Sequence, residues 1–214
     1  MASVAAGTWP TLGPVTHFLY LVRHGEASPH DGPLSEDGRE QARLTAQRLR
    51  KVPLGVIHHG PLPRAAETAA IIAEDFPGVP VSASDLAGDY LPSDPDPADL
   101  PPEYAGFVTS YPEAERAQGA RLGRAAIERF TQAGAEETHE LIVTHNFLIG
   151  WFVSHALAAP PWRWLGLNQM NGGLTVIAYE AAVPPRLISF NDAGHLPPRL
   201  RWTGFPPAMT PPSG

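Results

Sequence analysis

The chain has 214 residues, which suits one domain, and its 43% hydrophobic content argues against global disorder. Fifteen basic and 22 acidic residues give a net charge of −7, which argues against a nucleic-acid binder held by a broad basic surface. No cysteine is present, so disulfides, thiolate metal sites and a cysteine nucleophile are excluded.

The sequence contains neither a secretory signal nor a membrane-spanning segment that can be recognised. The first residues, MASVAAGTWPTLGP, lack a basic region and a sustained apolar run. No stretch has the roughly 20 apolar residues that a membrane span needs. We therefore expect a cytoplasmic protein with no membrane partner.

The first part of the chain alternates short apolar runs with helical patterns. The runs predict strands at 17–24, 55–59 and 79–83. A helix is expected at 35–50, with Ser35 as its N-cap. A second helix is expected at 61–76, where prolines stand at the start and the missing N–H matters least.

The segment at about 84–112 is polar and rich in proline. It shows no clear period and is longer than most connections, which predicts an active-site loop or lid inserted into a single domain spanning residues 1–214. The loop contains no lysine or arginine. It has four aromatic residues, which suggest tolerance for bulky or apolar leaving groups: Tyr90, Tyr104, Phe107 and Tyr111.

The remaining segments complete an alternating pattern of strands and helices. Helices are expected at 113–134 and 147–158, and strands at 140–146, 172–180 and 185–192. Such alternation predicts an α/β fold with a mostly parallel sheet.

Charged side chains stand where three of the predicted strands end. Arg23 and His24 end the first strand. Arg64 begins the helix after the second strand, and His145 follows the fourth. Ligands of parallel sheets bind outside the carboxyl ends of the strands, and guanidinium groups match phosphate in shape and charge. The sequence therefore predicts a phosphate site at this edge, whereas single histidines elsewhere are expected to be structural.

Four motifs resemble those of the histidine phosphatase, or phosphoglycerate mutase-like, superfamily. In chain order they are LVRHGEAS, HHGPLPRAAETA, LIVTHNFLIGWFV and NDAGHL, and they span about residues 17–200. The resemblance implies a three-layer α/β/α sandwich around a mostly parallel sheet. It also implies His24 as the nucleophile that forms a phosphohistidine.

In this family the other matching residues would bind the phosphoryl oxygens. These are Arg23, Arg64 and His145. Their charge lowers the tendency of His24 to take up a proton, so that it stays nucleophilic. No metal ion or cofactor is required, because the arginines supply the charge.

The proton donor is assigned from the layout of the loop. Many members use a glutamate here, but this chain has none between Glu74 and Glu103. The stretch SDLAGDYLPSDPDP resembles the branch of mutase-like Ser/Thr protein phosphatases and places Asp89 at the acid position. Asp85 is the alternative, although a loop or capping role suits it better.

Three further residues near the motifs have less defined expected roles. Glu26 could orient an arginine, and His30 could touch phosphate. His195 is expected to be structural.

These features predict a phosphatase that hydrolyses phosphomonoesters and releases inorganic phosphate. An acid phosphatase of broad specificity is expected, acting on small molecules or phosphoproteins. The alternatives are phosphotransfer of the phosphoglycerate mutase type and a non-catalytic module that binds phosphorylated ligands. A mutase needs an anchor for a carboxylate, which the loop lacks, and a binding module would be expected to lose the nucleophile or a pocket arginine.

Overall fold

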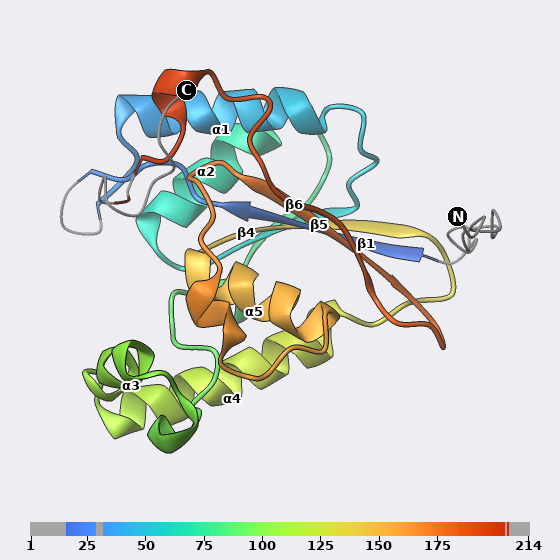
Figure 1. Cartoon of the computed structure of the whole chain (residues 1–214). Helices are drawn as coiled ribbons and strands as arrows, with labels where there is room; N and C mark the ends of the chain where they lie inside the picture. The colour runs from blue at the N-terminus through green and yellow to red at the C-terminus, as the bar shows by residue number, and fades with distance from the viewer. Residues whose placement is uncertain (1–15, 29–31, 204, 206–214) are drawn as a thin grey trace, which may run out of the picture.

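The computed structural model describes residues 16–28, 32–203 and 205, and these form a sheet covered by helices on both faces (Figure 1). The strands are β1 (Thr16–Arg23), β2 (Val56–His59), β3 (Val81–Ala83), β4 (Thr138–Thr144), β5 (Leu174–Glu180) and β6 (Arg186–Asp192). Their order across the sheet is β3-β2-β4-β1-β5-β6. This architecture confirms the three-layer α/β/α expectation.

The sheet is mostly parallel. β1 and β2 are both parallel to β4, and β3 is parallel to β2. β5 is antiparallel to both of its neighbours, β1 and β6. Among the described strands, β5 alone therefore runs in the opposite direction, and its amino end lies at the carboxyl edge of β1.

Four helices supply the two outer layers. α1 (Glu36–Leu49) and α2 (Pro63–Ala73) lie on one face of the sheet, and α4 (Glu113–Phe130) and α5 (Asn146–Ala156) lie on the other (Figure 1). Ser35 is the N-cap of α1, as expected, and its hydroxyl accepts a hydrogen bond from the Gly38 N–H at 3.0 Å.

Each face of the sheet has its own core. Successive strand residues point to opposite faces, so Leu19 and Leu21 join the core that contains Phe152 of α5. Val22 joins the core that contains Leu49 of α1 and Ile72 of α2. A strand buried on both faces must be apolar throughout, which explains the continuous run in β1.

The segment at 84–112 is more ordered than the predicted loop. It holds two 3₁₀ turns, Asp85–Ala87 and Pro97–Asp99, and the helix α3 (Pro102–Thr109). The apolar side chains of α3 follow helical spacing, at Tyr104, Phe107 and Val108. Prolines on both sides of this short segment made the pattern difficult to recognise in the sequence. These three side chains pack with the buried Trp164 in a separate apolar cluster. None of the helices in the described part of the chain is long and apolar enough to cross a membrane.

Candidate active site

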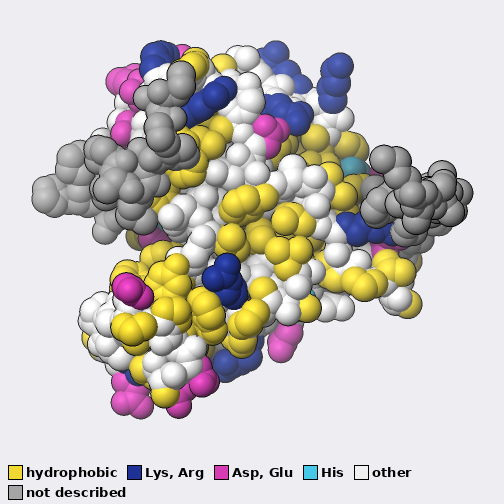
Figure 2. Space-filling model, in the orientation of Figure 1, with side chains coloured by type: hydrophobic (Ala, Val, Ile, Leu, Met, Phe, Trp, Pro, Cys, Tyr) yellow, Lys and Arg dark blue, Asp and Glu magenta, His cyan; other side chains and the backbone are white. Residues whose placement is uncertain are grey.

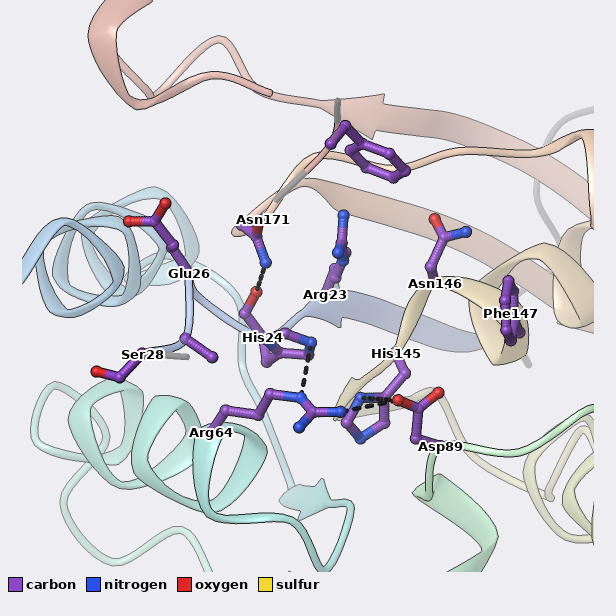
Figure 3. A pocket seen from close by; sticks show the side chains of 12 residues that line it. Arg23, His24, Glu26, Ser28, Arg64, Asp89, His145, Asn146, Phe147 and Asn171 are labelled. Carbon is purple, nitrogen blue, oxygen red and sulfur yellow. Dashed lines mark hydrogen bonds and ion pairs between the residues drawn. The ribbon is translucent and has the colours of Figure 1, made fainter. Parts of the chain in front are cut away.

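A cavity of about 390 Å³ opens at the carboxyl ends of β1 and β4 (Figure 3). It is lined by the expected nucleophile His24 and the expected acid Asp89. The three expected phosphate ligands line it as well: Arg23, Arg64 and His145. These residues come from the end of β1 and the residue after it, from α2, from the N-cap of α5 and from the segment before α3, so the fold brings together side chains that are far apart in the sequence.

The backbone and the ring of His24 are both held in place. Its N–H donates to the Thr144 carbonyl at 2.9 Å, and its own carbonyl accepts from the Asn171 side chain at 2.8 Å. The ring Nδ1 lies 2.7 Å from the Gly25 carbonyl oxygen. A carbonyl can only accept, so Nδ1 carries the proton and Nε2 keeps its lone pair.

Arg64 connects this ring to the acid. Its Nε donates to His24 Nε2 at 3.2 Å, which agrees with Nε2 being the unprotonated nitrogen. Its Nη2 donates to Asp89 Oδ2 at 2.8 Å. Thr68 braces the arrangement, because its hydroxyl donates to the Arg64 carbonyl and accepts from the Gly25 N–H.

The guanidinium of Arg23 forms the opposite wall. Its Nη1 donates to the Gln169 carbonyl at 2.7 Å, and its Cζ lies 4.6 Å from the centre of the Phe205 ring. Within the described residues its buried Nε has no hydrogen-bond partner. Burial lowers the pKa of Arg23 to about 10, so this group keeps its positive charge at neutral pH.

His145 is 1% exposed and stands at the N-cap of α5. Neither ring nitrogen has a hydrogen-bond partner in the described part of the chain, although Nδ1 lies 3.5 Å from Asp89 Oδ2. Burial, followed by the charges of Arg64 and Arg23, lowers the pKa of His145 to about 3. The ring is therefore neutral at pH 7 and can donate one N–H.

Burial also keeps His24 neutral. It is the largest cause of a pKa well below the usual value, and His145 and Arg23 lower the pKa further. The hydrogen bond with Gly25 opposes this shift. The result is a ring whose Nε2 remains unprotonated at neutral pH and below.

Asp89 stands at the rim of the cavity, where its side chain is 36% exposed. The turn before it is anchored to the sheet, since the Thr144 hydroxyl donates to the Ala87 carbonyl at 2.8 Å. Asp85, the alternative acid, lines a neighbouring cavity and not this one.

The remaining candidates have different positions. Glu26 lines the cavity, but its carboxylate accepts from the Ser35 hydroxyl at 2.7 Å, so within the described residues it braces the start of α1 and orients no arginine. His30 lies outside the described residues. His195 Nε2 lies near Thr45 and the Gly172 carbonyl, outside the cavity lining.

Sequence reasoning gave no role to several residues that line this pocket. Asn171 holds the His24 carbonyl, and Asn146 and Phe147 line the cavity. The signal for Asn171 is its place just before β5, because the amino end of an antiparallel neighbour lies at the carboxyl edge of β1.

Several known proteins are similar to this chain in sequence. The sequence profile of the histidine phosphatase superfamily (branch 1) matches residues 19–87 and 98–193. The mitochondrial serine/threonine-protein phosphatases PGAM5 of mouse and human are each 33% identical over 193 residues. These matches cover 86% of this chain and 65% of each relative, so the chain spans less than two thirds of their length.

Solved structures support the fold alone. YhfR of Bacillus stearothermophilus superposes with a TM-score of 0.63 at 21% identity, covering 84% of this chain and 98% of that one. A mycobacterial glucosyl-3-phosphoglycerate phosphatase superposes with a TM-score of 0.61 at 22% identity, covering 83% and 100%.

The relatives also correct one expectation. A cytoplasmic location was expected, but the mouse, rat and human relatives are all named as mitochondrial proteins, which contradicts it. The expectation rested on the lack of a secretory signal and of an apolar span, and neither feature separates cytosol from mitochondrion.

The matched profile covers most of the chain, and its two matched segments include the residues that form the cavity in β1, α2 and α5. The chain belongs to the histidine phosphatase superfamily (branch 1).

Proposed function

We propose that this protein hydrolyses phosphomonoesters through a phosphohistidine formed on His24. The observation that carries the proposal is the unprotonated Nε2 of His24, which accepts a hydrogen bond from Arg64 in a cavity lined by two guanidinium groups. A neutral ring nitrogen beside fixed positive charge suits attack on a phosphoryl group.

In the first step Nε2 attacks phosphorus, and the bond from phosphorus to the ester oxygen breaks. Asp89, as the carboxylic acid, donates its proton to the leaving oxygen. The Nδ1 proton stays on the ring, where the Gly25 carbonyl stabilises the charge that the ring gains. In the second step the Asp89 carboxylate takes a proton from water, whose oxygen attacks phosphorus. The bond from phosphorus to nitrogen then breaks and releases inorganic phosphate.

Three side chains would hold the phosphoryl oxygens during both steps. Arg23 and Arg64 provide fixed positive charge, and neutral His145 provides one N–H. Charge that develops on the oxygens in the transition state would be stabilised by these donors, which line the same cavity.

The substrates we propose are small phosphomonoesters or phosphoproteins. The relatives named as serine/threonine-protein phosphatases support phosphoproteins. Broad specificity with an acidic to neutral optimum is proposed as well, because Asp89 must be protonated to act as donor while His24 stays neutral below its usual pKa.

The test is release of inorganic phosphate from p-nitrophenyl phosphate between roughly pH 4 and 8. The wild type should turn over, and His24→Ala should lose turnover. His155→Ala, a change of an exposed histidine at the end of α5, is the matched control and should keep it. An inactive wild type, or an active His24→Ala, would contradict the proposal and redirect the search to mutase assays.

The role of Asp89 is tested with two kinds of leaving group. Asp89→Asn should slow hydrolysis of an alkyl phosphate by about 10²–10⁴-fold, because an alkoxide needs a proton to leave. The loss with p-nitrophenyl phosphate should be smaller. If Asp85→Asn shows this pattern and Asp89→Asn does not, the assignment is wrong.

A further inference from the structure

A second cavity, of about 490 Å³, adjoins the first and shares Asp89 with it. Its other walls come from the turn around Asp85, from Tyr90 and Tyr111, and from the first half of α4, including Glu115. It is larger than the phosphate cavity, so it can hold a sizeable group.

Its position follows from the proposed function, on which this inference rests. In-line attack by His24 places the leaving oxygen on the far side of phosphorus, beside the acid that protonates it. That acid is Asp89, which lines both cavities. The leaving group would therefore extend into the second cavity.

The cavity carries negative charge that is not balanced by ion pairs. Asp85 and Glu115 line it, and neither forms an ion pair with any residue in 16–28, 32–203 or 205. No lysine or arginine is among its described lining residues. The nearby Arg116 is neutralised by Asp94, whose carboxylate lies 2.8 Å from Arg116 Nε.

The aromatic walls add a second attraction for a cation. Tyr90 and Tyr111 line the cavity, and tyrosine rings attract ammonium and guanidinium groups. The pKa of Tyr111 is raised by burial and then by the charges of Asp89 and Glu115, so the fields of both carboxylates reach the same ring.

The walls are fixed before any ligand binds. The Tyr90 hydroxyl donates to the Leu86 carbonyl at 2.8 Å. Gly119 of α4 also lines the cavity, and an added Cβ there would collide with the Leu91 carbonyl, so the two backbones are in close contact. A preformed pocket binds without the entropy cost of ordering its walls.

We propose that this second cavity is a leaving-group subsite that selects phosphomonoesters carrying a positive charge, namely phosphorylated serine or threonine beside an arginine or lysine. Acidic side chains also gather on the surface at the end of the molecule formed by α3 and α4 (Figure 2). The negative field there would draw basic peptides toward the subsite and repel acidic leaving groups.

The test compares two phosphoserine peptides that differ only in flanking arginines or glutamates. For the wild type, kcat/KM should favour the arginine peptide by about tenfold. Glu115→Gln and Asp85→Asn should each reduce this ratio by about two- to fivefold, as expected for exposed charges. Glu115→Lys should reduce it further.

The matched control is Glu113→Gln, which removes the same charge from an exposed position on α4 outside the cavity lining. Its ratio of kcat/KM for the arginine peptide to that for the glutamate peptide should equal the wild-type ratio. Equal rates for both peptides, or a ratio that the Glu115 and Asp85 variants leave unchanged, would overturn the inference. Turnover of p-nitrophenyl phosphate in the same preparations separates this result from failure of the proposed function, which would leave every substrate intact.

A comparison of two small phosphomonoesters tests whether the preferred positive charge belongs to a peptide or to a small molecule. O-phosphoethanolamine and glycerol phosphate differ in charge but not much in size. If the amine is preferred while the two peptides are hydrolysed alike, the assignment to a peptide is wrong.

Discussion

The Nε2 atom of His24 accepts a hydrogen bond from Arg64 through the lone pair that would attack phosphorus. Both events cannot happen at once. Arg64 also donates to Asp89, so a phosphoryl group entering the cavity would compete for a guanidinium that is already hydrogen-bonded. Attack therefore requires Arg64 to exchange a ring nitrogen for a phosphoryl oxygen, which links release of the nucleophile to binding of the substrate.

Two buried neutral histidines make stability depend on pH. The pKa of His145 falls from 6.5 to about 3 on folding, and that of His24 is also lowered. Below pH 6.5 the unfolded chain therefore binds more protons than the folded protein. The contribution of these histidines to the free energy of unfolding should be greatest above pH 6.5 and decline as pH falls. The slope is about 1.4 kcal/mol per pH unit for each group.

Urea unfolding of the wild type and of His145→Gln between pH 7 and 5 measures this effect. The variant should lose less stability over that interval. Orthovanadate should flatten the wild-type curve, because an anion in the cavity raises the pKa of His145. A wild type that becomes more stable toward pH 5 would contradict the account.

Residues of the site could be predicted to different degrees. Arg23, His24 and His145 follow from one rule, since the carboxyl ends of parallel strands meet at one edge. Asn171 could not be placed, because its position depends on β5 running against β1. The stacking of Phe205 on Arg23 depends on how the chain after β6 returns to the cavity, which no local pattern encodes.

At the scale of elements, α4 and the segment after Asp89 are packed backbone to backbone. The approach is close at Gly119, where a methyl group would meet the Leu91 carbonyl, and at Gly123, where it would meet the Pro92 carbonyl. Gly119→Ala should lower the free energy of unfolding by about 1–3 kcal/mol through overpacking. It should also displace the segment of Asp89 and Leu91, which lines the second cavity together with Gly119.

Gly106→Ala in α3 is the matched control, because nothing lies within 4 Å of the added carbon. This change should raise stability by about 0.5–1 kcal/mol, as alanine is the better helix former. Denaturant unfolding of the two variants checks the contrast. Equal effects would mean that the close approach at Gly119 is absent.

The elements themselves were largely readable from the sequence. Strands buried on both faces and helices with one apolar face follow from periodicity, and β1 and α1 were placed within one residue of their bounds. α3 was missed because prolines surround eight residues whose apolar positions contact a local cluster and not the main core.

At the scale of the molecule, ligand binding should stabilise the whole fold, because the cavity joins both helical layers to the sheet. Orthovanadate at 100 times its Kd should add about 2.7 kcal/mol, which corresponds to a rise in Tm of roughly 5–10 °C. Arg64→Ala should abolish most of the rise, as measured by calorimetry. Arg50→Ala, which removes an exposed guanidinium paired with Asp75, should retain it.

The strand order has a consequence for how the molecule is made. His17 of β1 pairs with Thr138 of β4, 121 positions later, and Thr16 pairs with Glu180 of β5. A chain growing from its amino end therefore carries β1 without either neighbour until β4, more than 100 residues later, has been synthesised. Such distant pairings make folding slow. His24 gains its backbone partner Thr144 and its neighbour His145 only when β4 enters between β1 and β2, so the pocket cannot form before β4 has joined the sheet.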